Sequence, residues 1–279
     1  MLEQVHGLVI KSSMDAYAVV SNALLGACSN CFTAIVSGRL FCDLPIKDLV
    51  SWNTNIAAFA RSEAPERGLE LFSRMLLAGV LPNENTIVCV LVACIGVNSL
   101  VYGELIHAKA IKHNLCSSVY VGSSLVDFYA KCKRLEDAHN MFHEIPDQNV
   151  VTWNALISGC SSKDSRALPV LFKKMLHFGF RPNEFTFSSI LRKAAALTLW
   201  QLHSLIIRMG YENNDYVSSA LIASYDAHDM ISDALACTPA SVYPVHLALC
   251  NVVAGIYNRM GRYEDTKEML FQLQYPDTI

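Results

Sequence analysis

The residue types that could bind a metal or catalyse a reaction are scattered along the chain. Cys28 and Cys31 form its single C-x-x-C pair, and no second pair of ligands lies near it, which disfavours a zinc site. None of the nine histidines is followed two residues later by glutamate, as zinc deaminases require. There is no phosphate-binding glycine–lysine loop and no G-x-S-x-G elbow. We therefore predict that the chain is not an enzyme and needs no metal or cofactor.

Asparagine amides recur at one phase of a longer pattern. Asn22, Asn53, Asn154 and Asn251 each lie a few residues into an apolar segment. An amide both donates and accepts hydrogen bonds, so it can read the edge of an unpaired nucleobase. An exposed asparagine near a helix start is the plainer interpretation of any one of them, but their recurrence at one phase favours a shared role.

These asparagines belong to a sequence that repeats after about 100 residues. LVSWNTNI begins at Leu49 and VVTWNALI at Val150. A second matching pair is LELFSRMLLAGVLPNENT from Leu69 and PVLFKKMLHFGFRPNEFT from Pro169. Such a repeat indicates one structural unit used several times, so it decides the fold.

Within one unit the apolar spacing predicts a helical hairpin. Ile56 and Phe59 share one face of a first helix, and Pro65 suits the first turn of a second. Gly79 and then Pro82 are typical of the end of that second helix. Each hairpin leaves an apolar face that only a neighbour can cover, so we predict an all-α fold of stacked hairpins.

Composition supports an ordered, membrane-free protein but not an obvious nucleic-acid binder. Of the 279 residues 52% are hydrophobic and 17% charged, which argues against disorder. The ten cysteines lie mostly in apolar segments and indicate a reducing compartment, and the most apolar run, Ile87 to Val97, is too short to span a bilayer. The first residues resemble neither a signal peptide nor a transit peptide. The net charge of −3 weighs against nucleic-acid binding, because dedicated binders are usually basic.

The repeated strings resemble the plant pentatricopeptide repeat (PPR) family, in the subclass that alternates P-, L- and S-type repeats. VVTWNALI with the ending GFRPN is similar to the P type, and YVGSSLVDFYAKC from Tyr120 to the S type. TFSSILRKAA with LHSLIIRMGY is similar to the L type. The resemblance covers nearly the whole chain. It implies a right-handed α-solenoid of stacked helix–turn–helix repeats, a mitochondrial or chloroplast location, and single-stranded RNA read at about one base per repeat.

The resemblance also divides the chain into repeats. The predicted spans are a partial L type at 1–17, S at 18–48, P at 49–83, L at 84–118, S at 119–149, P at 150–183, a shortened L at 184–214, a degenerate S at 215–241 and S at 247–277. Pro169 falls within the second helix of its repeat, where we expect it to kink or delay that helix. Stacking is expected to be irregular near Pro239 and Pro244.

By the same resemblance, the fifth and last residues of each repeat select a base, and the second residue sandwiches it. The predicted RNA-selecting residues are Asn22, Asp48, Asn53, Asn83, Ser123, Asn149, Asn154, Asn183, Ser219, Asn251 and Asp277. The predicted sandwiching residues are Val19, Val50, Tyr120, Val151 and Tyr216. The implied RNA, 5′ to 3′, is U, pyrimidine, spacer, A, pyrimidine, an unassigned base, purine, U. Val88 marks the spacer because it cannot hydrogen-bond a base, and Trp52 and Trp153 are expected in the core instead.

The expected function is sequence-selective RNA recognition in organellar RNA processing or editing. The C-terminal extension and deaminase domains of editing members are absent from this sequence, so a deaminase or editing-factor protein would act in trans. Two alternatives stay open. One is a protein-interaction scaffold, which an apolar or acidic groove would favour over a basic, asparagine-lined one. The other is a truncated, non-functional gene product, because the sequence starts within a repeat.

Overall fold

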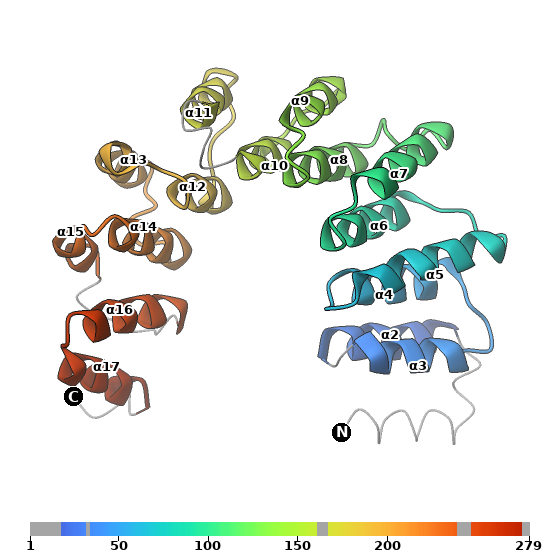
Figure 1. Cartoon of the computed structure of the whole chain (residues 1–279), viewed down its shortest axis with the longest axis horizontal. Helices are drawn as coiled ribbons and strands as arrows, with labels where there is room; N and C mark the ends of the chain where they lie inside the picture. Colours follow the sequence, from blue (N-terminus) through green and yellow to red (C-terminus); the bar gives the residue numbers. More distant parts are fainter. Residues whose placement is uncertain (1–17, 32–33, 161–166, 239–246, 275–279) are drawn as a thin grey trace. The chain divides into compact units, whose positions relative to one another are not determined.

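The computed structural model describes residues 18–31, 34–160, 167–238 and 247–274. This part of the chain consists of α-helices and the turns that join them, with no strand (Figure 1). The chain divides into two compact units, residues 1–148 and 149–279. The predicted all-α fold of stacked hairpins is confirmed within each unit.

The first unit is a stack of helical hairpins. Its described helices are α2 (Ala18–Cys31), α3 (Ala34–Asp43), α4 (Leu49–Ala60), α5 (Pro65–Leu77), α6 (Glu84–Gly96), α7 (Leu100–Lys112), α8 (Val119–Lys131) and α9 (Leu135–Glu144). The first helices of the hairpins, α2, α4, α6 and α8, pack in succession on one another and form one layer. The second helices, α3, α5, α7 and α9, lie outside that layer (Figure 1).

The second unit repeats this arrangement. Its described helices are α10 (Val150–Gly159), α11 (Ala167–His177), α12 (Glu184–Leu191), α13 (Ala196–Arg208), α14 (Asp215–Ala227), α15 (Ile231–Ala236), α16 (Leu247–Arg259) and α17 (Tyr263–Gln274). Here α10, α12, α14 and α16 pack in succession. The layer of first helices in each unit therefore presents the start of every repeat along one surface.

Helix boundaries follow the predicted repeat spans closely. From residue 18 onward each span contains two of these helices, and its first helix begins at the first residue of the span, as α4 does at Leu49 and α6 at Glu84. The partial repeat at 1–17 lies outside the described residues, as do Pro239 and Pro244. The division into P, L and S types stays a prediction.

The core of each hairpin is built from the apolar positions that the spacing predicts. Ile56 of α4 and Met75 of α5 are fully buried, and Phe59 is buried beside them. Trp52 packs edge-on against Phe41 of the preceding hairpin, with ring centroids 4.7 Å apart. Trp52 and Trp153 are both buried, so they fill the core as expected rather than facing a ligand.

Glycine ends the second helix of the hairpin as predicted. Gly79 follows α5 with a φ of 75°, a left-handed conformation that glycine adopts without strain. The N–H of Val80 donates to the Met75 carbonyl at 3.2 Å, and that of Gly79 to the Leu76 carbonyl at 3.0 Å. This pair of bonds is the Schellman motif, which satisfies carbonyls left open at the helix end.

The kink or delay expected from Pro169 stays a prediction, because residues 161–166, just before its helix, lie outside the described residues. Helix α11 begins at Ala167, so Pro169 lies in its first turn. Backbone N–H groups of a first turn have no acceptor within the helix, and a proline there removes no hydrogen bond.

In the part of the chain that the structure describes, no helix is long and apolar enough to cross a membrane.

Candidate nucleic-acid interface

The last residues of five predicted repeats cap the first helix of the next one with their side chains, whereas Ser118 makes no such bond to α8. Side-chain oxygens of these residues accept backbone N–H groups two or three residues on: Asp48 from Ser51 at 2.8 Å, Asn83 from Thr86 at 3.0 Å, Asn149 from Thr152 at 3.1 Å, Asn183 from Thr186 at 3.1 Å and Asn214 from Val217 at 3.1 Å. Asparagine and aspartate are among the best N-caps, which gives these positions a structural role. The cap uses one side-chain oxygen of each residue, and the other polar atom of the side chain can make a further contact.

Three of the predicted selecting pairs are hydrogen-bonded to each other. The Nδ2 of Asn22 donates to Asp48 Oδ2 at 2.9 Å. The same bond joins Asn53 to Asn83 Oδ1 at 3.1 Å and Asn154 to Asn183 Oδ1 at 3.0 Å. All six side chains are half-buried. The fold therefore makes the same contact in three repeats, each time between residues that are 26 to 30 positions apart in the sequence.

The predicted serines behave differently. Ser123 Oγ donates to the Val119 carbonyl and Ser219 Oγ to the Asp215 carbonyl, each at 2.6 Å within its own helix. Ser123 belongs to the first unit, whereas its predicted partner Asn149 caps α10 in the second. Asn251 is exposed on α16, and its predicted partner Asp277 lies outside the described residues.

Threonines that the sequence analysis did not single out complete two of the pairs. Thr86 Oγ1 donates to Asn53 Oδ1 at 2.7 Å, and Thr186 Oγ1 to Asn154 Oδ1 at 2.6 Å. Both threonines are fully buried. The signal was present in the strings NENT and NEFT, where a threonine three residues after the cap is suited to a capping box.

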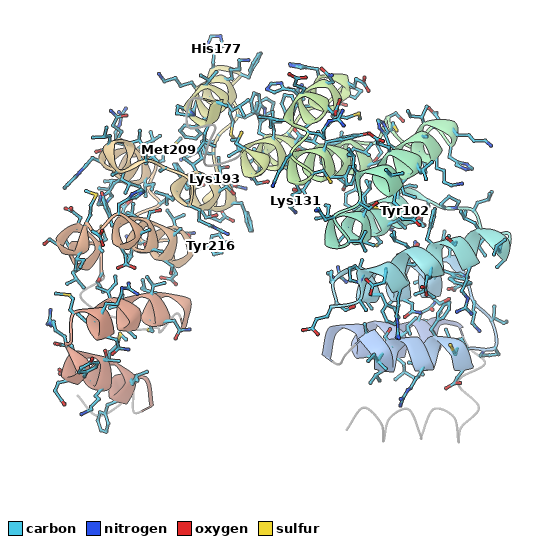
Figure 2. All side chains as sticks on the ribbon, viewed as in Figure 1. Tyr102, Lys131, His177, Lys193, Met209 and Tyr216 are labelled. Carbon is cyan, nitrogen blue, oxygen red and sulfur yellow. The ribbon has the colours of Figure 1, made fainter. Side chains whose placement is uncertain are left out.

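The second-position side chains are exposed at the start of their helices. Val19, Val50, Tyr120, Val151 and Tyr216 are between 42% and 81% exposed. Tyr216 lies on the face of α14 opposite α15 (Figure 2). Phe185, the second residue of α12, was missed although it holds the same position. It is 54% exposed, and its ring centroid lies 5.6 Å from that of Tyr216.

The first helices that carry the asparagines hold few charges. Neither a basic nor an acidic residue occurs in α2, α4 or α10. Partial burial acts to raise the pKa of Asp48, but hydrogen bonds from the Ser51 N–H and the Asn22 amide outweigh it and lower that pKa, so Asp48 is ionised at neutral pH. The surface is therefore lined by amides, being neither strongly basic nor strongly acidic.

Two lysines close to this layer are already engaged. Lys131 lies 2.7 Å from Asp127 on the same helix. Lys193 donates to the Ser158 carbonyl and, at 3.2 Å, to the Ile157 carbonyl, at the end of α10. Burial lowers the pKa of Lys193. Both lysines are therefore engaged in contacts within the protein.

Known proteins with similar sequences have the same repeats. The PPR repeat family model matches residues 148–195, and the PPR repeat model matches residues 50–80 and 123–150. The pentatricopeptide repeat-containing protein At3g58590 of Arabidopsis thaliana is 42% identical over 281 residues, covering 99% of this chain and 37% of the relative. The mitochondrial At3g09040 of the same plant is 30% identical, covering 100% and 28%. The chain thus spans well under half of the length of these relatives.

Solved structures are less similar. The crystal structure of the pentatricopeptide repeat protein PPR10 from maize matches with a TM-score of 0.46 and 14% identity, covering 98% of this chain and 46% of that one. PPR10 with an 18-nt psaJ RNA element matches with a TM-score of 0.42 and 15% identity, covering 92% and 48%. Repeat models that match at three places and a relative that matches along 99% of the sequence show that the chain belongs to the pentatricopeptide repeat family.

Proposed function

We propose that the chain binds single-stranded RNA in a sequence-selective manner, with the fifth and last residues of its repeats contacting the bases. The observation that carries this proposal is the hydrogen-bonded pair at one repeat phase, seen for Asn22–Asp48, Asn53–Asn83 and Asn154–Asn183. Each pair orients a half-buried amide that still has hydrogen-bonding capacity. Unpaired bases are the RNA feature that such groups can read.

The second-position side chains would hold each base from its two faces. Tyr120, Phe185 and Tyr216 supply aromatic rings there, and Val50 and Val151 supply apolar surface. Stacking of a base on an aromatic side chain contributes about 1–3 kcal/mol per base. This contribution offsets the weak electrostatic attraction expected from a net charge of −3.

The predicted target runs U, pyrimidine, any base, A, pyrimidine, any base, purine, U. Fluorescence anisotropy with this RNA and with a scrambled RNA of the same composition tests the proposal. Asn53→Ala should reduce the preference for the target, because the base loses its hydrogen-bond partner. Asn140→Ala, which removes an exposed asparagine from the second helix α9, is the matched control and should leave the preference unchanged. Equal binding of both RNAs by the unaltered chain would show that it does not read sequence.

We further propose that this recognition serves RNA processing or editing in a mitochondrion or chloroplast. Relatives named mitochondrial and chloroplastic support the location. A non-catalytic adaptor would need a deaminase or editing factor supplied in trans. Incubation of the chain with a target RNA containing cytidine should therefore give no uridine, and conversion by the chain alone would contradict the adaptor role.

A further inference from the structure

Thr86 and Thr186 occupy equivalent places beneath two of the paired asparagines. Each is the third residue of a first helix and is fully buried. The Thr86 hydroxyl accepts the Asn83 backbone N–H at 3.1 Å and lies 2.7 Å from Asn53 Oδ1 and 2.9 Å from Asn83 Oδ1. Thr186 repeats all three contacts, with Asn183 N, Asn154 Oδ1 and Asn183 Oδ1 at 3.1, 2.6 and 3.0 Å.

The helix cap fixes which way the Asn83 amide points. Asn83 Oδ1 accepts the Thr86 backbone N–H, and the Nδ2 of that amide could not do so. Asn53 must then turn its own Nδ2 toward Asn83 Oδ1, because two carbonyl oxygens would repel. Asn53 Oδ1 is left facing the Thr86 hydroxyl, whose single proton it accepts at the shorter of the two distances.

The Asn53 amide is consequently held at both ends. One Nδ2 proton and one Oδ1 lone pair are used inside the repeat, so one N–H and one lone pair remain, in a fixed order. Uracil presents a donor at N3 and an acceptor at O4, whereas cytosine presents an acceptor at N3 and a donor at N4. An amide that cannot flip matches one of these orders better than the other.

We propose that Thr86 and Thr186 are positioning residues that give Asn53 and Asn154 a preference between uracil and cytosine, the two pyrimidines that the family resemblance leaves undivided at these repeats. This inference rests on the proposed RNA binding and deepens it, since it concerns how the same amides are held. The threonines themselves touch no base.

Other repeats provide the contrast. Ser51, the third residue of α4, donates its hydroxyl to the Asp48 carbonyl at 2.8 Å and not to Asn22, whose Nδ2 donates to Asp48 Oδ2. Thr152 accepts the Asn149 N–H at 3.1 Å, as Thr86 accepts that of Asn83, but donates to the Asn149 carbonyl at 2.7 Å. Thr152→Val therefore removes a comparable helix-cap bond without touching Asn53 or Asn154, which makes it the matched control.

The first measurement needs no RNA. In the full chain labelled with ¹⁵N, NMR relaxation reports how rigid the side-chain amides of Asn53 and Asn154 are. The double variant Thr86→Val and Thr186→Val should loosen both amides, Thr86→Ser with Thr186→Ser should keep them rigid, and Thr152→Val should leave them unchanged. Amides equally rigid in the valine variant would overturn the proposed locking.

The second measurement is the ratio of affinities for RNAs that differ only as U or C opposite these two repeats. We expect the unaltered chain to discriminate by about 5-fold per position, the worth of one hydrogen bond, and the valine variant to lose most of this. The serine variant should restore it. If the unaltered chain and the valine variant show the same ratio of affinities for the U and C RNAs, and that ratio differs from one, this inference alone is overturned. A chain that binds target and scrambled RNA equally overturns the proposed function, and the specificity role of the threonines with it.

Discussion

At the scale of single residues, aromatic rings are unevenly distributed along the proposed RNA-binding surface. Phe185 and Tyr216 begin successive first helices in the second unit, and their ring centroids are 5.6 Å apart. In the first unit Val19 and Val50 hold the same position, and Tyr120 is the aromatic one. Since aromatic rings stack on bases better than valine does, the second unit should contribute more stacking free energy.

Tyr216→Ala should therefore weaken RNA binding by about 5- to 150-fold, corresponding to about 1–3 kcal/mol of lost stacking. Tyr216→Phe keeps the ring and should bind almost as the unaltered chain does. Tyr263→Ala, on the second helix α17, removes another exposed tyrosine, 61% exposed against 42% for Tyr216, away from the proposed surface and serves as the control. Anisotropy titrations with the target RNA measure all three; a loss with Tyr263→Ala as large as with Tyr216→Ala would contradict the placement.

Two histidine–tyrosine pairs, in which the histidine is half-buried, make stability depend on pH. His107 Nδ1 lies 2.8 Å from the Tyr129 hydroxyl, and His203 Nδ1 lies 3.0 Å from that of Tyr225. Burial lowers the pKa of both histidines in the folded chain and outweighs the opposite effect of Glu144 and Asp233, respectively. As the pH falls, the unfolded chain therefore takes up protons on these histidines before the folded chain does. Their contribution to the free energy of unfolding is fully present above about pH 6.5 and decreases as the pH falls below that value.

The urea concentration at the unfolding midpoint should accordingly decrease as the pH is lowered from about 7 to about 5. Replacing both histidines by glutamine should reduce this fall, because glutamine can still bond to the tyrosine hydroxyl but takes up no proton. An identical fall in the variant would mean that other groups set the pH dependence.

At the scale of helices, close packing rather than propensity sets one contact in the first unit. Gly103, the fourth residue of α7, lies against the fully buried ring of Phe128 in α8. A Cβ added at Gly103 would lie 1.8 Å from that ring, which is far inside van der Waals contact. Glycine is needed there because the two helices approach so closely.

Gly103→Ala should destabilise the chain by about 1–3 kcal/mol, the usual cost of overpacking a core. Gly26→Ala in α2 is the matched control, because among the described residues no heavy atom beyond its chain neighbours and its own helix backbone lies within 4 Å of the added Cβ, and alanine favours helix. Urea unfolding followed by circular dichroism compares the two. A Gly103→Ala chain as stable as the Gly26→Ala chain would show that Phe128 can move aside at no cost.

Local signals in the sequence predict the helices well, and the side-chain network less so. Some features depend on residues that are close together in the chain, and these were predictable. They are the helix starts at Leu49 and Glu84, the helix end at Gly79 and the burial of Trp52. Thr86 escaped prediction because its role depends on Asn53, which is brought to it only by folding. Likewise, Ser219 has a nearer acceptor within its own helix, a competition that sequence position alone does not reveal.

At the scale of the whole molecule, charge is the feature that least resembles a nucleic-acid binder. The net charge is −3, and no basic residue occurs in α2, α4 or α10. Binding through base edges and stacked rings releases few counterions, because it neutralises few phosphates.

RNA affinity should therefore depend only weakly on salt. The slope of log K against log salt concentration should be no steeper than about −3, which corresponds to about four phosphate contacts on a single strand. Titrations at several potassium chloride concentrations measure this slope. A slope of about −6 or steeper would mean that phosphate contacts dominate and that the amide surface contributes little to affinity.

Asp48, Asn83 and Asn183 each cap a helix and, in the function we propose, each also selects a base, which limits how such a protein can change its target during evolution. Each of these residues starts the helix of the following repeat, and replacing an N-cap by an alanine-like residue costs about 0.5–2 kcal/mol. We therefore expect these positions to tolerate mainly replacements by Asn, Asp, Ser or Thr, the small polar residues that can cap a helix. It also follows that a repeat exchanged between two proteins carries with it the cap of its neighbour, so retargeting one base alters the start of the next helix along the chain.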